Sequence, residues 1–388
     1  MRFAILGADT ESIELASAAK SMGHSLLWCG DLAEFGHFSA EWGLEDEGHL
    51  WEGLLEGDAL DGVILGRGST DPDLRTEQLN QLTKSQVPVL TTFPLVDSVL
   101  AYYEVDMSRG ESGAVLRHFN PLIEQQALVQ QCDQWITDGH PELGSIEQVV
   151  WERPLAERTQ QNVLWHFSRD VEFLALIAGG LNRLGALGSP DQAATYAGLS
   201  VQLLGRREVP VRWQVGPIEQ DDHPRLVLIA QNGKLTVEFD ENSRPIKLVA
   251  SPAGENQTAE LESADASQSS IQRFIDAFSS PAGDQTSSWS RALAAMELTD
   301  TIEIALRRGR MIEVHQQQLT EQMAFKGTMS AVGCGVLLII PPIVLLLGWI
   351  AGEMGLSISK YWPHALLAML GLFLGFQLIP KLLFKADE

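Results

Sequence analysis

The first 31 residues, MRFAILGADTESIELASAAKSMGHSLLWCGD, indicate the fold of the chain. A short apolar run ends at Gly7, and apolar residues then recur at helical spacing until Gly23. A second apolar run, residues 26–29, is followed by Asp31. A strand, a helix, a second strand and then an acid is the order of a dinucleotide-binding half, in which the acid binds a ribose hydroxyl. Gly7 and Asp31 are therefore expected to contact a dinucleotide.

The glycine motif of this half is incomplete. Where G-x-G-x-x-G is expected, residues 7–12 read GADTES, so only Gly7 is kept. A side chain in place of the second glycine obstructs the pyrophosphate. Asp9 and Glu11 also place negative charge at a helix N-terminus, where an anion would bind, although the same acids stabilise the dipole of an ordinary helix. The turn therefore predicts that binding of NAD or NADP is weak or lost.

Short strands and helices continue to alternate up to residue 120. Strands are expected at residues 61–66, 87–92 and 116–119, and helices at 76–85 and 95–105. This alternation predicts a parallel sheet that is covered on both faces, as in a Rossmann-like α/β domain. Arg67 follows the first of these strands, at the edge where ligands bind in open α/β sheets. Arg67 is expected either to contact a phosphate or to be a solvated loop residue.

The pattern changes after residue 144, where strands follow one another. Residues 226–229 and 235–239 are joined by Asn232-Gly233, which favours a β-hairpin. Successive strands predict an α+β domain with an open antiparallel sheet. We therefore predict a dinucleotide-binding domain over 1–120 and a substrate and dimerisation domain over 121–315.

Two uncharged stretches lie near the end of the chain, at 327–352 and 361–380. Each meets the requirement of about 20 apolar residues for a membrane helix. Basic residues lie mainly before and after these two stretches and not in the short segment between them. By the positive-inside rule, both ends of the chain are then expected in the cytoplasm. The sequence thus predicts a transmembrane hairpin over 327–380, with the lipid bilayer as partner. The expected location is the cell inner membrane, with two spans and cytoplasmic soluble domains. The alternative is a helical hairpin buried in a soluble core.

Charge and cysteine content exclude several classes of protein. The formal net charge is −24, which disfavours nucleic acid as a partner because such a surface repels phosphates. The three cysteines, Cys29, Cys132 and Cys334, are far apart and suggest neither a disulfide framework nor a metal site.

Three segments of the chain resemble segments of one protein family, and they occur in the same order along the chain as in that family. They are VPVLTTFPLV (87–96), VLWHFSRDVEFLALIAGG (163–180) and RALAAMELTDTIEIALRRGRMIEV (291–314). Together with the first strand, helix and strand, they resemble the Gfo/Idh/MocA family over roughly residues 1–315. The resemblance implies an NAD(P)-dependent oxidoreductase, a sugar- or polyol-like ligand and a homodimer formed through the open sheet. The hairpin at 327–380 lies outside the usual architecture of the family.

The resemblance also suggests site residues, although the motifs are degenerate. The Glu-Lys-Pro motif of the family corresponds to residues 92–94, where Pro94 is kept and Phe93 replaces the lysine. Phenylalanine can neither donate nor accept a proton. The histidine that takes the substrate's proton corresponds best to His166. Asn162 and Asp170 lie four residues before and after it, on one helical face. The alternative is that His166 is a packing residue.

The residues expected in catalysis are His166, Asn162 and Asp170, and those expected to bind the cofactor are Gly7, Asp31, Arg67 and Pro94. The expected function is a membrane-anchored NAD(P)-dependent oxidoreductase of sugar- or polyol-like substrates. The alternative is a catalytically inactive ligand-binding or scaffold protein at the inner membrane face. Loss of the lysine favours that alternative, whereas the family resemblance favours the enzyme.

Overall fold

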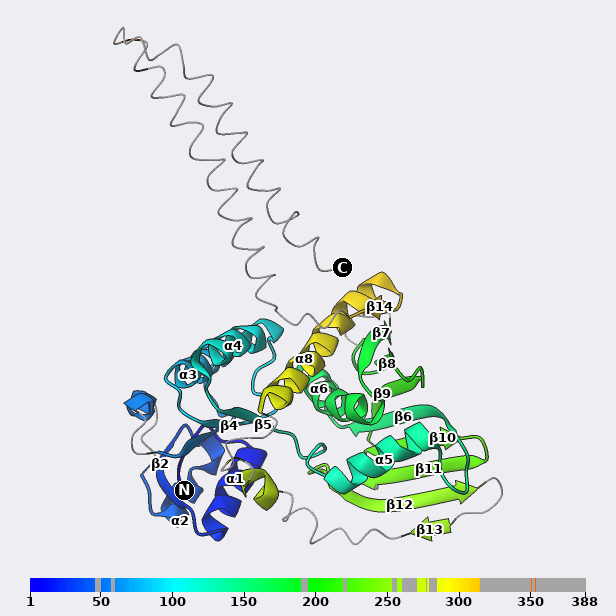
Figure 1. Cartoon of the computed structure of the whole chain (residues 1–388), viewed down its shortest axis with the longest axis horizontal. Helices are drawn as coiled ribbons and strands as arrows, with labels where there is room; N and C mark the ends of the chain where they lie inside the picture. Colours follow the sequence, from blue (N-terminus) through cyan, green and yellow to red (C-terminus); the bar gives the residue numbers. More distant parts are fainter. Residues whose placement is uncertain are drawn as a thin grey trace, which may run out of the picture. The chain divides into compact units, whose positions relative to one another are not determined.

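The computed structural model describes residues 1–45, 50–56, 60–189, 195–218, 222–252, 257–259, 271–276, 278, 285–314, 350 and 353. Residues 1–316 form one compact unit, which contains two β-sheets (Figure 1). The expected boundary between two domains at residue 120 stays a prediction.

The first sheet has five parallel strands in the order β2-β1-β3-β4-β5. The strands are β1 (Arg2–Leu6), β2 (Ser25–Gly30), β3 (Gly62–Leu65), β4 (Val89–Thr92) and β5 (Leu116–Phe119). Helix α1 (Thr10–Ser21) covers one face, and α3 (Pro72–Lys84) and α4 (Val99–Ser112) cover the other (Figure 1). Alternate residues of β1 belong to different apolar clusters, Ala4 with Leu79 and Ile5 with Leu15. The predicted parallel sheet with two covered faces is confirmed.

Short helical segments connect β2 to β3. They are the 3-10 helix η1 (Ala33–Phe35), the helix α2 (His37–Trp42) and the 3-10 helix η2 (Trp51–Glu56). Trp51 and Leu54 are buried in the same apolar cluster as α3 and α4, so this connection is tied to the core.

The second sheet has nine strands in the order β13-β12-β11-β10-β6-β9-β8-β7-β14. Their bounds are β6 (Ile146–Leu155), β7 (Leu181–Leu187), β8 (Ser200–Gly205), β9 (Val211–Pro217), β10 (Arg225–Ala230), β11 (Gly233–Phe239), β12 (Pro245–Pro252), β13 (Gln257–Ala259) and β14 (Ile312–Glu313). The hairpin expected at Asn232-Gly233 joins β10 and β11, which pair antiparallel.

The sheet is mixed, which corrects the prediction of an antiparallel sheet. β6 and β9 pair in parallel, with Val149 opposite Val211. The reason is the helix α6 (Gln160–Ile177), which carries the chain from β6 back to the start of β7. Two reversals, from β7 to β8 and from β8 to β9, then leave β9 running in the direction of β6.

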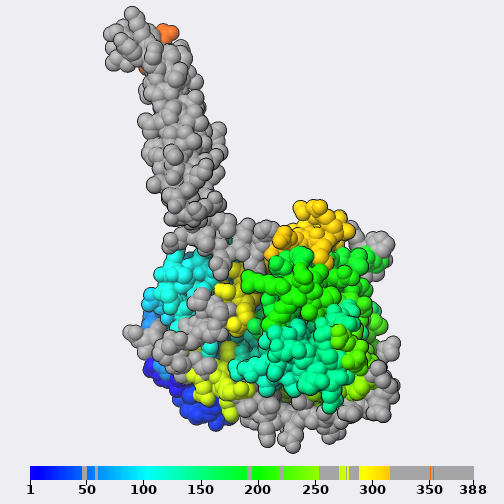
Figure 2. Space-filling view, turned by 45° about the vertical axis from the view of Figure 1, so that its right-hand side comes forward, coloured from blue at the N-terminus to red at the C-terminus, as the bar shows by residue number. Residues whose placement is uncertain are grey.

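Three helices contribute to the core beside the second sheet: α5 (Gln126–Asp138), α6 and α8 (Gln285–Arg308). Side chains of β9 and β10 alternate between buried and half-buried, as expected for strands with one covered face. Helix α8 contacts α4 and β5 as well as α6 and β7, so it packs against both sheets (Figure 1). In Figure 2, α8 (yellow) shows between the cyan and green residues on either side of it.

The predicted inner-membrane localisation is contradicted. Within the described residues, no helix combines the length and the apolar character that a membrane span requires. The longest, α8, carries charged side chains along its whole length, including Arg291, Glu297 and Glu303. The spans expected at 327–352 and 361–380 lie outside the described residues, apart from Ile350. We therefore withdraw the membrane location and the bilayer as a partner.

Candidate functional site

The candidate site lies at the carboxyl edge of the first sheet, defined here as the residues that directly follow β1 to β5. The strand order changes direction between β1 and β3, because β2 lies on one side of β1 and β3 on the other. Ligands of open α/β sheets bind outside the carboxyl ends of the strands at such a switch point. The expected cofactor-binding residues Gly7, Asp31 and Arg67 all lie at this edge.

Gly7 forms the tight turn between β1 and α1. Its φ is +74°, a conformation that side chains disfavour. A Cβ atom at this position would lie 2.5 Å from the carbonyl oxygen of Gly66 and 2.5 Å from Nη2 of Arg75. The turn therefore needs glycine for its conformation and for its close approach to β3.

Asp9 caps the N-terminus of α1. Its Oδ1 accepts a hydrogen bond from the Ser12 backbone N–H at 2.8 Å. Its Oδ2 accepts from the Arg67 backbone N–H at 2.8 Å and from the Thr92 hydroxyl at 2.7 Å. The N–H groups at a helix N-terminus form a favourable site for an anion. Here the anion is a carboxylate of the chain itself.

Asp31 lies directly after β2, as expected of a ribose ligand, but its carboxylate already has partners. It accepts hydrogen bonds from the Ser69 and Thr70 hydroxyls at 2.7 and 2.6 Å, and it pairs with the buried Arg75. Burial raises the pKa of Asp31, but the hydrogen bonds from Thr70 and Ser69 and the charge of Arg75 outweigh it, so the pKa is lowered. Asp31 is thus an ionised group held in place by its neighbours.

The roles of Arg67 and Pro94 in cofactor binding stay predictions. Nη2 of Arg67 forms an ion pair with Asp97 at 2.6 Å, and both side chains are partly exposed. Pro94 follows a cis peptide bond with Phe93. The Phe93 ring is 3% exposed, and its centroid lies 5.1 Å from that of His118. The position that carries a lysine in the family resemblance is thus part of the packed interior.

The three residues expected in catalysis lie on α6 but do not form one hydrogen-bonded group. Asp170 pairs with Arg153, whose Nε lies 2.9 Å from its Oδ2, and accepts a bond of 2.8 Å from the Trp213 indole. Asn162 donates to the Glu157 carbonyl at 2.6 Å. Asp170 therefore faces β9 of the second sheet, whereas Asn162 stabilises the start of α6.

His166 lies between these two residues on α6, with its ring centroid 4.6 Å from that of Trp165. Burial and the nearby charges of Arg153 and Arg169 lower the pKa of His166 to about 2. The imidazole is therefore neutral at physiological pH and binds a proton poorly. Its role as the proton acceptor stays a prediction.

A buried polar cluster at the end of β5 was not predicted. His118 Nε2 lies 2.6 Å from Glu172 Oε1, and His118 Nδ1 lies 2.9 Å from the Ser288 hydroxyl. Asn120 donates to the other Glu172 oxygen at 2.9 Å. The position of His118 and Asn120 at a strand end was a usable signal in the sequence. Glu172 and Ser288 come from α6 and α8, so only the tertiary structure reveals them.

A further ionisable group lies near this cluster. The pKa of Glu124 is raised to about 7, because burial and the charge of Glu172 oppose its ionisation more than the charge of Arg117 favours it. The end of β5 thus combines an imidazole with carboxyl groups, the side chains used for general acid–base catalysis.

An ion pair connects α1 to α6. Glu11 Oε1 lies 2.8 Å from Arg169 Nη1, with side-chain exposures of 18% and 6%. The Arg169 guanidinium also stacks over the Trp165 ring at 4.5 Å. Its Nε has no hydrogen-bond partner among the described residues. A buried, incompletely bonded cation therefore lies beside the N-terminus of α1.

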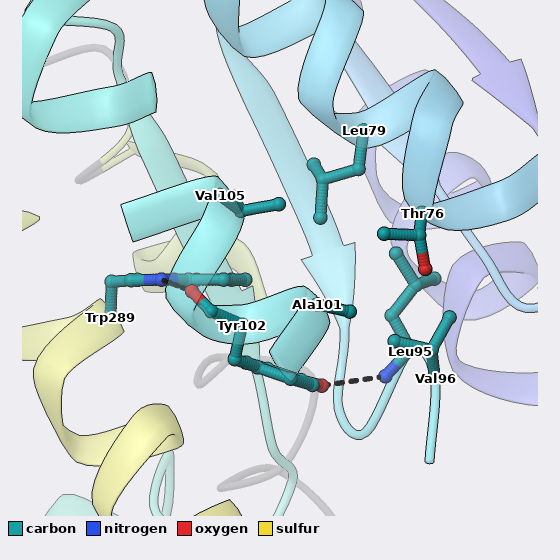
Figure 3. Close-up of a pocket in the computed structure, with 8 residues that line it drawn as sticks. All are labelled: Thr76, Leu79, Leu95, Val96, Ala101, Tyr102, Val105 and Trp289. Atoms are coloured by element: carbon teal, nitrogen blue, oxygen red, sulfur yellow. Dashed lines mark hydrogen bonds between the residues drawn. The ribbon is translucent and has the colours of Figure 1, made fainter. Parts of the chain in front are cut away.

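A small apolar cavity lies between α3, α4 and α8 (Figure 3). Leu79, Val105 and Trp289 are among its lining side chains, and the Tyr102 hydroxyl accepts a hydrogen bond from the Leu95 N–H at 3.0 Å. Its volume of about 10 Å³ is that of a single water site and is far below the roughly 300–1,000 Å³ of small-molecule pockets. We assign no ligand to it.

The carboxyl edge fits a dinucleotide in part. Gly7 provides the tight turn, and Asp31 provides a carboxylate at the end of the neighbouring strand. The Asp9 carboxylate, however, lies where a pyrophosphate would approach the first turn of α1. The residues present therefore suit the ribose better than the phosphates.

Comparison with known proteins shows the fold. No family model and no curated protein matches the chain. Solved structures do match, among them an oxidoreductase from Agrobacterium radiobacter in complex with NAD⁺, L-tartaric acid and magnesium. Its TM-score is 0.63 at 12% identity, over 81% of this chain and 98% of the other.

Two further structures have similar scores. The WlbA dehydrogenase from Bordetella pertussis, in complex with NADH and UDP-GlcNAcA, has a TM-score of 0.61 at 16% identity, over 81% of this chain and 98% of the other. A putative myo-inositol dehydrogenase from Sinorhizobium meliloti has a TM-score of 0.59 at 15% identity, over 81% of this chain and 100% of the other. These structures are of the Gfo/Idh/MocA type. The likeness confirms the expected fold and gives no support to the expected homodimer.

Proposed function

We propose that the chain is an NAD(P)-dependent oxidoreductase that acts on a small sugar- or polyol-like molecule. The observation that carries this proposal is the pair formed by Gly7 and Asp31. They provide a tight turn and an ionised carboxylate at the ends of two adjacent parallel strands, beside the switch point of the sheet. The proposal is supported by solved structures of the same fold that contain NAD⁺ or NADH.

In this proposal each residue at the carboxyl edge has a defined role. The Asp31 carboxylate accepts hydrogen bonds from a ribose, and Ser69, Thr70 and Arg75 hold it in position. Gly7 lets the backbone of β3 approach the turn. The bound nicotinamide would supply hydride transfer. The chain must supply the proton transfer, and we assign this role to His118, whose Nε2 is held by Glu172. Because the His118 side chain is buried and its Nδ1 bonds to the Ser288 hydroxyl, the substrate would have to take the place of that hydroxyl at Nδ1.

A titration of the full chain with NADH and with NADPH tests the nucleotide part of the proposal. We expect saturable binding for at least one of them, followed by fluorescence, and competition by ADP-ribose, which carries the same ribose and pyrophosphate. Absence of saturation at millimolar nucleotide would contradict the proposal.

The assignment of the proton acceptor has its own test. His118→Gln is expected to lower kcat by at least 100-fold, the order of a general base, with myo-inositol and UDP-sugars as trial substrates. His166→Gln is the matched control, because it removes an imidazole from α6 instead of β5. A loss of activity in His166→Gln alone would restore His166 as the acceptor.

A second function is favoured by Phe93. Its ring is buried against His118, so the site lacks the lysine that the family resemblance places there. A protein that binds a ligand without hydride transfer would not need a lysine at this position. Saturable nucleotide binding without turnover of any trial substrate would favour this second function over the enzyme.

A further inference from the structure

We infer that Asp9 is a built-in competitor of the nucleotide, whose carboxylate occupies the place of a phosphate at the N-terminus of α1. A nucleotide would have to displace it in order to bind. The inference rests on the proposed function, since it concerns the same site, and it deepens it by adding a regulating residue.

Three hydrogen-bond donors surround the Asp9 carboxylate. They come from three different elements: the Ser12 N–H from α1, the Arg67 N–H from the segment after β3, and the Thr92 hydroxyl from the end of β4. All three are 2.7–2.8 Å from the carboxylate oxygens. Donors that converge from a helix N-terminus, a loop and the end of a strand suit a phosphate as well as they suit a carboxylate.

Arg169 supports the inference independently of the helix N-terminus. Arg169 is 5% exposed, and its Nη1 pairs with Glu11 in the first turn of α1. Its Nε is buried and has no hydrogen-bond partner among the described residues. Buried donors normally have partners, so a further acceptor would satisfy this nitrogen on the side chain that pairs with the first turn of α1. A phosphate oxygen is such an acceptor.

The charge of the first turn of α1 also opposes the binding of an anion. The first turn of α1 carries two carboxylates, Asp9 and Glu11, and both are bonded to groups that would attract an anion. A dinucleotide pyrophosphate would meet these negative charges at close range, which opposes its binding. The expected result is a low affinity that rises when the competing carboxylate is removed.

The experiment compares the wild-type chain with Asp9→Ser and Asp9→Asn, using NADH as the probe and inorganic pyrophosphate as its competitor. Serine and asparagine both cap helices well, so α1 keeps its start while the charge is lost. We expect Kd for NADH to fall at least tenfold in Asp9→Ser, because the smaller side chain also vacates space. Asp9→Asn should give a smaller decrease in Kd.

The matched control is Asp61→Asn, which removes an acid that pairs with Arg2 at the opposite edge of the same sheet. It should leave Kd unchanged. Glu11→Gln provides a second measurement that does not disturb the Asp9 cap, and it should lower Kd about threefold. Thermal melting followed by circular dichroism checks that each variant is folded.

The outcomes separate this inference from the proposed function. Saturable binding by the wild type with the same or higher Kd in folded Asp9→Ser overturns the inference and leaves the function intact. Saturable binding by the wild type with a Kd at least tenfold higher than that of folded Asp9→Ser supports both the inference and the proposed function. Binding by Asp9→Ser alone contradicts the proposed function of the natural chain, and with it an inference about how that chain binds a nucleotide. Absence of binding in every variant overturns both.

Discussion

At the scale of single residues, the polar groups of the candidate site are satisfied mainly by one another. Asp31 is bound by Ser69, Thr70 and Arg75, and His118 is bound by Glu172. Buried polar groups require such partners because an unmade hydrogen bond in the interior is costly. The site is therefore organised before any ligand arrives, and a ligand must exchange contacts rather than only add them.

His166 gives a prediction about pH. Its pKa is lowered from 6.5 to about 2, so below about pH 6.5 the unfolded chain binds a proton that the folded chain does not. The stability associated with the neutral ring is complete above pH 6.5 and is lost as the pH falls toward 2. In urea unfolding, His166→Gln should therefore gain stability relative to the wild type as the pH falls from 7 to 5. An identical pH dependence of the two proteins would contradict the lowered pKa.

At the scale of elements, α6 presents different faces to the two sheets. Arg169 and Glu172, three positions apart, bond to Glu11 of α1 and His118 of β5. Asp170 instead bonds to Arg153 and Trp213 in the second sheet. The resemblance predicted a helix for this segment correctly, but Asp170, one of the three residues with four-residue spacing, bonds to the second sheet and not to the end of β5.

The turn between β1 and α1 gives a prediction with a matched control. Gly7→Ala should lower the free energy of unfolding by more than about 2 kcal/mol. A left-handed conformation costs roughly 1–2 kcal/mol, and the new Cβ would also overlap the Gly66 carbonyl oxygen, 2.5 Å away. Gly23→Ala has a similar φ of +83° but no neighbour within 4 Å, so only the conformational cost should remain. Equal losses in urea unfolding would show that the close approach contributes nothing.

At the scale of the whole molecule, the two sheets are joined by buried contacts. Helix α8 packs against both, and Trp289 of α8 stacks on Tyr102 of α4 with ring centroids 5.0 Å apart. The ion pair Glu11–Arg169 connects α1 with α6, and the partly exposed pair Glu14–Arg244 connects α1 with the turn between β11 and β12. Entry of a nucleotide beside α1 would therefore be coupled to the contact between the sheets.

The ion pair between Glu11 and Arg169 gives the corresponding prediction. Arg169→Met should lower the free energy of unfolding by roughly 3–5 kcal/mol, because it leaves a poorly exposed carboxylate without its partner. Hydrogen exchange should also become faster in the first turn of α1. Arg307→Met is the control, since its pair with Glu303 has side-chain exposures of 70% and 61% and exposed pairs contribute at most about 1 kcal/mol. Similar losses in both variants would contradict the role of Glu11–Arg169.

The sequence by itself determined the local features of this protein. The periodicity of residues 1–31 predicted β1, α1 and β2, and Asn232-Gly233 predicted the hairpin between β10 and β11. These features depend on neighbouring residues, whose spacing and turn preferences are visible in the sequence. The sequence also singled out Gly7 and Asp31, because each lies at the end of an apolar run, and both lie at the carboxyl edge.

Only the tertiary structure decided the partners of these residues. The parallel pairing of β6 with β9, the ion pair of Asp31 with Arg75 and the bonds of His118 to Glu172 and Ser288 join segments far apart in the chain. Such contacts depend on how distant strands and helices pack in the folded chain. The spacing of neighbouring residues does not encode this packing. For the same reason the sequence showed the negative charge of Asp9 but not the three donors that hold its carboxylate on α1.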